Sequence, residues 1–481
     1  MMSATRLQLR FLSDDELGQI ESTAYRLLEE VGISLQHARA SEMLHGLGCR
    51  IEKGRAYIPQ QIVRWGLDHV TPANTFRNRD GSSEFVMGDG AIRFHNSGGP
   101  PYILDLDTGM RRLATLQDAA DITRVLDALP NVDVITPLFG PQDVPAELMS
   151  IASTATMLRN TTKPVTAAAA ENAQEVRYKI EMAAACCGGM EAYRKRPTMS
   201  VSVSPVSPLT FTEKVTEAII TVAELGSPFH SLPAPSLGAT GPITLAGALA
   251  QQHAEVLASF VIVAAARAGS PVMYCSRINP IDMRTAISSW GGPEVGMAGA
   301  CATQLAHRLG LPCDAYGMCS SSAKLDPQYA YERFANAMIP GLAGADIMSG
   351  IGGLESGLSG GHEIAVMDDE MAALLKRIVR SFAVNEDTLA FDVIREVVAG
   401  DGVFLAQTHT AQQMRRGALW IPGVSERATG TGDDPNAGVV ARARSRAREI
   451  LRSHEVQPLP DDVSRHLDEI IARARRELTA K

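Results

Sequence analysis

Short apolar runs rich in β-branched residues alternate with long helical segments from about residue 91 onward. Eight such runs lie at 91–96, 132–139, 164–169, 198–204, 228–234, 271–276, 312–318 and 345–351. Segments with helical spacing follow them at 115–129, 146–160, 172–187, 212–226, 244–269, 292–310, 327–344 and 368–382. Regular β–α alternation predicts parallel strands joined by right-handed crossovers. Eight units predict that residues 91–385 form an α/β fold of the (β/α)₈ TIM barrel type.

An open, doubly wound sheet is the alternative arrangement of the same alternation. It would carry a glycine-rich nucleotide fingerprint after an early strand. None is present in the sequence.

Residues 1–90 predict an N-terminal helical extension. Ser13 and Glu16 have the spacing of a capping box, and Gly32 is placed to end that first helix. A second short helix is expected after Pro59.

Residues 386–481 predict a C-terminal helical segment. A helix is expected at 384–400, a loop-rich run at 402–430, and then two charged helices split by Pro458 and Pro460.

Composition narrows the function classes. The net charge is −9, and no block of Lys or Arg occurs before the C-terminal end, which argues against a nucleic-acid partner. The seven cysteines are odd in number and form no CxxC pair, so reduced thiols in a cytoplasm are expected. The start of the chain turns acidic where a secretion signal needs its apolar run.

The most apolar segment, 256–269, is too short to span a bilayer and is interrupted by Arg267, so no membrane association is expected. The sequence thus predicts a soluble cytoplasmic protein. Its Ala-rich helices are compatible with a homo-oligomer.

The stretch "PSLGATGPITLAGALAQQHAEVLA" (235–258) has the layout of an anion-binding loop before a helix. It lacks the Gly-Lys-Ser/Thr of a P-loop and is not GxGxxG. In a barrel it is the loop after the fifth strand, on the catalytic face. Gly238 and Thr240 either shape a turn there or leave backbone N–H groups free for an anion such as a substrate carboxylate.

Polar and aromatic side chains lie at the ends of the other predicted strands, where active sites of barrels are built. Aromatic rings there would attract a cationic ammonium group, and a carboxylate would balance its charge. The candidate substrate-binding residues are His95, Asn96, Phe139, His230, Gly238, Thr240, Tyr274, Arg277, Tyr316 and Met318.

A zinc site is the competing hypothesis. Cys275 and Cys319 follow the sixth and seventh strands, and His95, His230 or Glu355 would complete the shell. No local spacing supports it, and neither an HExxH nor a GxSxG motif is present. No bound metal is therefore expected.

Several segments, in a fixed order, resemble the trimethylamine methyltransferase family. They include "SVSPVSPLTF", "GATGPITLAGALAQQHAEVLA", "SWGGPEVGMAGACATQLAHRLGLP" and "GHEIAVMDDEM", and the resemblance extends from about residue 10 to residue 430. It implies a TIM barrel that moves a methyl group from a methylated amine to the cobalt of a separate corrinoid protein. No tightly bound cofactor is then expected in this chain.

Founding members of that family use pyrrolysine, whereas this sequence contains only the twenty standard residues. It resembles the branch without pyrrolysine, which includes glycine betaine methyltransferases. The substituted position is expected in the loops 317–326 or 351–362, which makes Lys324 and Glu355 the candidate catalytic residues.

This departure favours a quaternary amine as substrate. A quaternary ammonium leaves as a neutral tertiary amine, so the enzyme needs only to orient the N–CH₃ bond and exclude water. A zinc-dependent barrel methyltransferase and a non-catalytic betaine-binding protein remain the alternatives.

Overall fold

Parallel strands surrounded by helices form the centre of the molecule. The structure, a computed structural model, describes residues 9–167, 169–427 and 438–479. Residues 1–8, Ala168, 428–437 and 480–481, which belong to segments predicted above, lie outside the described residues. In spatial order the central strands are β10 (Val165–Ala167), β11 (Met199–Val203), β13 (Phe229–Ser231), β15 (Ser270–Ser276), β18 (Cys313–Tyr316), β19 (Ile347–Ile351) and β7 (Arg93–Asn96). The α/β class and seven of the eight expected strands are thereby confirmed.

The predicted strand at 132–139 is reduced to isolated bridges between the two ends of this curled sheet. Val134 bridges to His95 of β7, and Ile135 bridges to Val165 of β10, both in parallel orientation. Beyond them Pro137 has no N–H to donate, so a regular ladder cannot continue. The side chain of Asn96 takes the place of backbone pairing: its Nδ2 donates to the Thr136 carbonyl (2.7 Å) and its Oδ1 accepts from the Thr136 N–H (3.0 Å).

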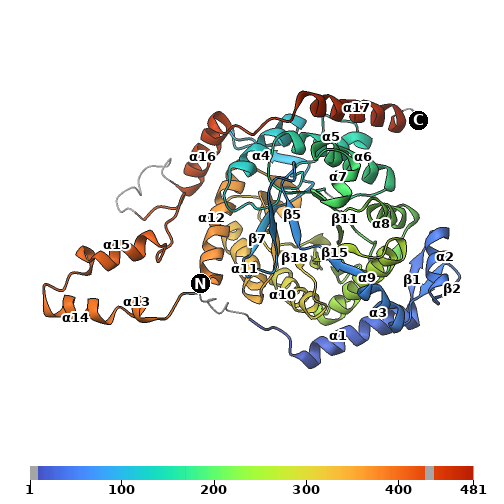
Figure 1. The fold of residues 1–481 in the computed structure, drawn as a ribbon, viewed down its shortest axis with the longest axis horizontal. Coiled ribbons are helices and arrows are strands. Elements are labelled where there is room, and N and C mark those ends of the chain that lie inside the picture. Colours follow the sequence, from blue (N-terminus) through green and yellow to red (C-terminus); the bar gives the residue numbers. More distant parts are fainter. Residues whose placement is uncertain (1–8, 168, 428–437, 480–481) are drawn as a thin grey trace.

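A ring of helices surrounds the strands in sequence order (Figure 1). They are α4 (Leu116–Ala128), α5 (Ala146–Arg159), α6 (Ala173–Cys186), α8 (Glu213–Leu225), α9 (Leu245–Ala266), α10 (Pro293–Arg308), α11 (Pro327–Ala343) and α12 (His362–Val379), with the short α7 (Met190–Lys195) after α6. Each lies within a predicted helix except α7, which was not predicted, and α12, which begins six residues before the expected start because Gly361 already serves as its N-cap.

Helix α9 corrects one prediction. The apolar segment is part of a 22-residue helix, so it is long enough to cross a bilayer by length and composition. However, 94% of its most apolar window is buried inside the structure. It is the one such candidate among the described residues, and it is a core helix.

The N-terminal segment is mixed rather than purely helical. The expected helix is α1 (Asp14–Arg26), which has the Ser13–Glu16 capping box and continues as a π-helical turn, η1 (Leu27–Val31), to Gly32. The helices α2 (Ala38–Gly46) and α3 (Gln60–Asp68) follow, and Pro59 caps α3 as expected. The strand β1 (Ile33–Leu35) precedes α2, and β2 (Arg50–Glu52) and β3 (Arg55–Tyr57) lie between α2 and α3. β1 pairs with β12 (Thr210–Phe211), a short strand in the segment after β11.

A hairpin fills the end of the barrel where its strands begin. It follows β4 (Val70–Pro72), which pairs with the start of β15, and consists of β5 (Thr75–Arg77) and β6 (Glu84–Val86). Phe76 of this hairpin packs in a small cluster with the buried Val134, Met273 and Ile347. The interior is therefore closed at this end and open at the other.

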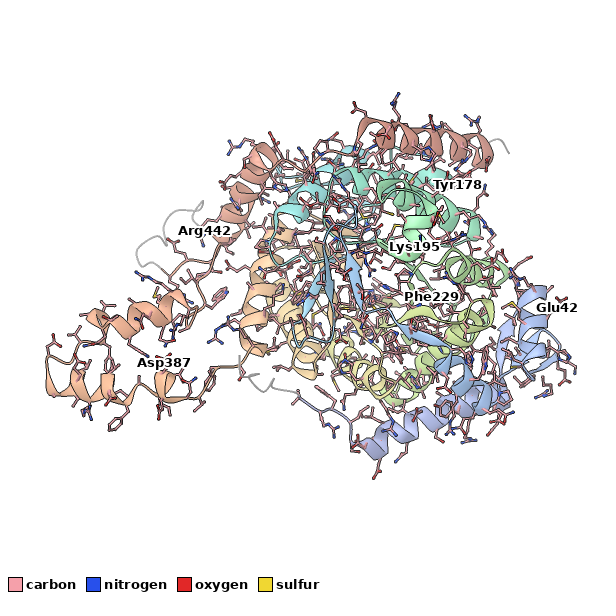
Figure 2. All side chains as sticks on the ribbon, in the orientation of Figure 1. Glu42, Tyr178, Lys195, Phe229, Asp387 and Arg442 are labelled. Atoms are coloured by element: carbon pink, nitrogen blue, oxygen red, sulfur yellow. The ribbon has the colours of Figure 1, made fainter. Side chains whose placement is uncertain are left out.

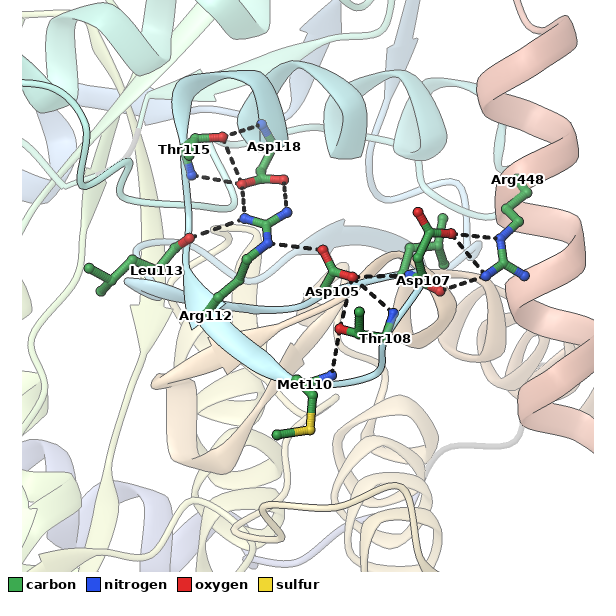
Figure 3. Close-up of polar contacts among 10 residues, drawn as sticks. Asp105, Asp107, Thr108, Met110, Arg112, Leu113, Thr115, Asp118 and Arg448 are labelled. Carbon is green, nitrogen blue, oxygen red and sulfur yellow. Dashed lines mark hydrogen bonds and ion pairs between the residues drawn. The ribbon is translucent and has the colours of Figure 1, made fainter.

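The open end, called the mouth here, is bordered by loops with short strands. They are β8 (Tyr102–Leu104), β9 (Arg111–Leu113), β14 (Ser236–Leu237), β16 (Asn279–Asp282), β17 (Ile287–Ser288), β20 (Gly353–Leu354), the 3₁₀ turn η2 (Glu355–Gly357) and β21 (Ser359–Gly360). Arg112 of the β8–β9 hairpin binds Asp118 of α4 (2.6 Å) and Asp105 (2.9 Å), as Figure 3 shows. Arg448 holds the tip of the same hairpin through Asp107 (3.1 Å), also seen in Figure 3.

The two charged helices expected at the C-terminus are α16 (Val439–Ser453) and α17 (Asp461–Leu478). α16 packs on α4 and α12, and α17 packs on α5 and α6. Before them the chain leaves the ring as a projecting arm, residues 382–423, with α13 (Glu386–Leu389), α14 (Phe391–Ala399), η3 (Phe404–Ala406) and α15 (Thr408–Arg415). Figure 1 shows the arm directed away from the barrel. α15 lies in the run expected to be loop.

A buried arginine joins the last two barrel strands to their helices. Arg333 of α11 is fully buried and pairs with Asp368 of α12 at 2.9 Å. It also donates to the carbonyls of Met318 (2.6 Å), Gly350 (3.1 Å) and Gly353, which lie after β18 and around β19. These contacts fix the loops of one side of the mouth.

Replacing Arg333→Met should destabilise the protein by about 3–5 kcal/mol, because Asp368 is then left buried without its cation. The exposed pair Arg448–Asp107 offers the matched control, and Arg448→Met should cost less than about 1 kcal/mol. Denaturant unfolding of the two variants measures the difference. Equal losses in both would contradict the role given to Arg333.

Candidate active site

A cavity of about 490 Å³ lies inside the barrel at the mouth end of its strands. Every central strand contributes to its wall, and so does the 132–139 segment. The polar and aromatic lining residues are His95, Asn96, Ser97, Thr136, Thr166, Ser202, Ser204, His230, Arg277, Trp290, Asp314, Tyr316, Ser349 and Ser356. A cavity of this size suits a small molecule.

The carboxylate of Asp314 is the centre of the polar contacts in this cavity. Arg277 Nη2 donates to Asp314 Oδ2 at 2.7 Å, and His95 Nε2 lies 3.3 Å from both carboxylate oxygens. Burial alone would raise the pKa of Asp314, but the charges of Arg277 and His95 hold it well below its usual range. Asp314 is therefore an anion at neutral pH, and strands β7, β15 and β18 meet at it.

Two aromatic rings lie against this charged group. Trp290 and Tyr316 meet edge to face, with ring centroids 4.8 Å apart. The Arg277 guanidinium carbon lies 5.3 Å from the Tyr316 centroid, and the Tyr316 hydroxyl lies 3.3 Å from Ser97 Oγ. The Cys319 thiol donates to the Trp290 carbonyl (2.9 Å), which ties the Trp290 loop to the loop after β18. The cavity thus offers π surface next to a fixed anion, a combination that suits an organic cation.

Two buried polar atoms in the wall have no partner within the described structure: His230 Nε2 and Ser349 Oγ. Burial lowers the pKa of His230 to about 4, so its imidazole is neutral at pH 7. Buried polar atoms are normally hydrogen-bonded. Both residues border the cavity, but these two atoms themselves are almost fully shielded from solvent.

The structure brings five of the predicted site residues together in this cavity: His95, Asn96, His230, Arg277 and Tyr316. The side-chain amide of Asn96 is hydrogen-bonded to the backbone of Ser97 and Thr136, so this residue shapes the cavity wall. The other four have polar or aromatic groups toward the cavity.

Tyr274, Phe139 and Met318 lie elsewhere. Tyr274 is fully buried on the helix side of β15, 3.2 Å from His253 Nδ1 of α9, because alternate residues of a strand face opposite sides. Phe139 borders a separate cavity of about 420 Å³ under the C-terminal end of α17. Met318 is buried, and its carbonyl accepts from Arg333.

The loop with Gly238 and Thr240 uses its backbone N–H groups within itself. The N–H groups of Ala239, Thr240 and Gly241 all reach the Ser236 carbonyl at 3.0 Å, and that of Gly238 donates to the Gly241 carbonyl. Thr240 Oγ1 accepts from the Ser236 N–H. The turn interpretation therefore fits residues 238–241, and an anion at this loop would have to bind the N–H groups of Ile243 and Thr244 before α9.

The candidate catalytic residues Glu355 and Lys324 lie at the mouth, outside the set that lines the cavity. Glu355 pairs with Arg111 of the β8–β9 hairpin at 2.8 Å and accepts from Ser359 Oγ at 3.1 Å. Lys324 is exposed in the loop between β18 and α11.

Sequence reasoning missed Asp314, Trp290 and Ser349. Asp314 stands two residues before Tyr316 in the same strand, so the alternation of a strand puts both on one face. An acid inside an otherwise apolar strand was the available signal. Trp290 comes from the long loop between β15 and α10, and no local pattern marks it.

The two cysteines of the zinc hypothesis do not form a ligand set. Cys275 is buried in the apolar cluster around Phe76, and the Cys319 thiol donates to the Trp290 carbonyl at 2.9 Å. Among the described residues, no group of three or more His, Cys, Asp or Glu is placed to hold a metal ion.

Comparison with known proteins shows which family the chain resembles. The family model described as "Trimethylamine methyltransferase (MTTB)" matches residues 2–479. A trimethylamine methyltransferase MttB of Desulfitobacterium hafniense is 31% identical over 472 residues, covering 97% of this chain and 94% of that protein. A glycine betaine methyltransferase of the same species is 29% identical over 470 residues, covering 97% of each.

Among solved structures, the monomethylamine methyltransferase MtmB of Methanosarcina barkeri superposes with a TM-score of 0.51 at 15% identity, over 92% of this chain and 94% of that one. This likeness concerns the fold alone.

The fold and the buried cation-compatible cavity define an α/β enzyme with its site at the carboxyl ends of parallel strands. The chain belongs to the MttB family of trimethylamine methyltransferases, whose members act on methylamines or betaines.

The buried His230 should make stability depend on pH. Its pKa falls from an ordinary 6.5 to about 4 on folding, so the unfolded chain binds one more proton between these values. The stabilisation is complete above about pH 6.5 and is lost as the pH falls toward 4, at about 1.4 kcal/mol per pH unit. Chemical denaturation across this range measures the free energy of unfolding against pH. In His230→Gln, the slope of that plot should fall by the contribution of one proton. The exposed His45→Gln should retain the full slope, and an unchanged slope in His230→Gln would contradict the burial argument.

Proposed function

We propose that this protein demethylates a quaternary amine resembling glycine betaine and passes the methyl group to the cobalt of a separate corrinoid protein. The observation that carries the proposal is the cavity in which Trp290 and Tyr316 lie beside the Asp314–Arg277 pair. The aromatic faces and Asp314 suit the trimethylammonium end of such a molecule.

The opposite end of the substrate would be a carboxylate held by Arg277 and His230. Arg277 already donates to Asp314 through Nη2, so its guanidinium links the two charge-recognising parts of the cavity. The unpartnered His230 Nε2 can donate one hydrogen bond as a neutral imidazole. In the loop Gly238–Thr244, the N–H groups of residues 238–241 are used within the turn, which favours Arg277 as the carboxylate partner.

The proposed methyl transfer requires little of this chain beyond holding the substrate in position. In the transfer, the cobalt(I) of the acceptor substrate attacks the methyl carbon, a Co–C bond forms, and the C–N electron pair stays on nitrogen. The amine leaves neutral and the cobalt is formally cobalt(III), so no protein group must give or take a proton. The anionic Asp314 beside the ammonium and the neutral His230 beside the carboxylate fit this requirement, because they orient the substrate without reacting.

The acceptor protein would approach over the mouth. Large apolar side chains are exposed on the loops that surround it, on the hairpin after β7 and after β11, β13, β15 and β19: Met110, Leu113, Val206, Ile243, Met283, Ile287 and Leu358. Exposed apolar rims of this kind mark docking surfaces.

We further propose the finer features that accompany this function. The fold is a (β/α)₈ barrel with an incomplete second strand, and the protein belongs to the branch without pyrrolysine and works in the cytoplasm. Lys324 and Glu355 remain candidates at the mouth, where they would act on the acceptor protein and not on the amine.

The direct test incubates the purified protein with free cob(I)alamin and either glycine betaine or trimethylamine, and follows methylcobalamin by absorbance. Methylcobalamin should form with the betaine and not with trimethylamine. Equal turnover of trimethylamine would overturn the quaternary-amine assignment. Tight betaine binding without any turnover would favour the non-catalytic alternative.

Removing the indole in Trp290→Ala should weaken betaine binding about 3- to 30-fold, the range expected for one lost cation–π contact. Trp290→Phe, which keeps an aromatic face, should recover most of the affinity. Calorimetric titration measures both. The half-exposed Trp65, which stacks on His69 far from the cavity, supplies the control Trp65→Ala.

The substitution Arg277→Lys distinguishes binding of the substrate carboxylate from binding of its ammonium group. It keeps the charge beside Asp314 but loses the planar fork, so glycine betaine should bind at least about 10-fold more weakly. Tetramethylammonium, which has no carboxylate, should bind as before. Equal losses for both ligands would show that Arg277 only positions Asp314.

A further inference from the structure

The turn η2 (Glu355–Gly357) at the mouth has a backbone conformation that ordinary side chains rarely adopt. All three of its residues have positive φ angles: 54° at Glu355, 53° at Ser356 and 85° at Gly357. This conformation suits the glycine, but in the other two residues it brings the Cβ atom too close to the following carbonyl oxygen. Two such residues in succession persist only where the surrounding structure holds them.

Backbone hydrogen bonds hold one side of η2 against the loop that follows β18. The Glu355 N–H donates to the Ser322 carbonyl at 3.0 Å, and the Ser356 N–H donates to the Ser320 carbonyl at 2.9 Å. That loop is attached to α11, because the Ser320 hydroxyl donates to the Glu332 carboxylate at 2.8 Å. One side of the turn therefore rests on a fixed loop.

An ion pair holds the other side of η2. Arg111 Nη1 of the β8–β9 hairpin donates to both carboxylate oxygens of Glu355, at 2.8 and 2.9 Å, and the Ser359 hydroxyl donates to the same carboxylate at 3.1 Å. The Arg111 guanidinium carbon also lies 4.4 Å from the centroid of the Tyr102 ring, which restricts its position. The side chain of the first left-handed residue is thus attached to a neighbouring hairpin.

The remaining two residues of the turn face the cavity. Ser356 and Gly357 line it together with Trp290 and Tyr316, whereas Glu355 lies outside the lining. The Glu355 carboxylate therefore affects the cavity through the backbone of the turn and not by contact. A change in the conformation of the turn would move this part of the wall.

We propose that Glu355 and Arg111 are positioning residues for the methyl transfer: their pair keeps η2 left-handed, so that Ser356 and Gly357 complete the cavity wall around the amine. This role rests on the proposed function, since the cavity must hold the amine for its wall to matter. Neither charged group touches the amine. The wall that binds it is fully populated only while the pair holds the turn.

The same pair lies within the apolar rim of the mouth. Met110 and Leu113 lie close to Arg111 in the sequence of the hairpin, and Leu358 directly follows the turn; all three side chains are at least half exposed. An acceptor protein that docks on this rim therefore covers the Arg111–Glu355 pair. The pair connects the surface that the acceptor contacts with the wall of the cavity behind it.

Replacing Glu355 with alanine and with glycine distinguishes this positioning role from a chemical one. Both variants lack the carboxylate, but glycine adopts positive φ angles readily and alanine does not. Glu355→Ala should raise the dissociation constant of glycine betaine about 5- to 30-fold, the factor that corresponds to one unsupported left-handed residue. Glu355→Gly should bind within about 3-fold of the unaltered protein. Calorimetric titration measures both.

Hydrogen exchange of the ligand-free protein provides a second readout that needs no substrate. The Ser356 N–H donates to the Ser320 carbonyl, so its exchange rate reports whether the turn keeps its conformation. This amide should exchange about 5- to 30-fold faster in Glu355→Ala and in Arg111→Ala, and close to the unaltered rate in Glu355→Gly. The double variant Arg111→Ala, Glu355→Ala should exchange no faster than either single variant, because the two residues act as one unit.

The matched control is Lys53→Gly, which replaces another left-handed residue (φ 49°) between β2 and β3. Figure 2 shows Glu42 of the same N-terminal segment at the outer edge of the molecule, away from Phe229 of the barrel. This variant should change neither betaine affinity nor Ser356 exchange.

Two results would overturn the positioning role. One is an equal loss of betaine affinity in Glu355→Gly and Glu355→Ala, which would assign a direct role to the carboxylate. The other is a Ser356 exchange rate that is alike in the unaltered protein and in every variant. A failure of the unaltered protein to bind betaine would instead contradict the proposed function, and the exchange rates would still decide whether the pair holds the turn.

Discussion

The carboxylate of Asp314 sets the constraint on which the site depends. Removing such a charge from water costs several kcal/mol unless cations and hydrogen bonds compensate it. Arg277, which directly follows β15, and His95 of β7 supply that compensation from two other strands. These three charged side chains meet inside the barrel at its mouth end, where aliphatic side chains therefore do not fill the interior. The cavity lies at this end. The lower half is filled by Phe76 and its apolar neighbours.

A second buried cation, Arg333, carries the mouth loops. It binds carbonyls that follow β18 and surround β19, and its charge is balanced by Asp368 behind the strands. The loop that contains Trp290 is then attached to this framework through the Cys319 thiol. The aromatic wall of the cavity is therefore held by the protein interior. The two buried arginines therefore have different roles. Arg277 balances the charge of Asp314 inside the cavity, and Arg333 holds the loops at the mouth.

Periodicity predicted most of the fold, because eight β–α units and their helices leave a strong pattern in the sequence. The alternation of side chains along a strand would also have predicted much of the site. Met273, Cys275 and the following Arg277 lie on one side of β15, whereas Tyr274 faces the helices. The same alternation pairs Asp314 with Tyr316. What the sequence cannot show is long-range placement. Trp290 reaches the cavity from a loop, Asn96 replaces a missing strand ladder, and the Gly238–Thr240 turn consumes its own N–H groups.

The arm illustrates another limit of pattern reading. The apolar positions of α14 indicate a helix with one covered face, but they do not say which chain covers it. In the structure that face points outward, and polar contacts around Asp387 keep it so.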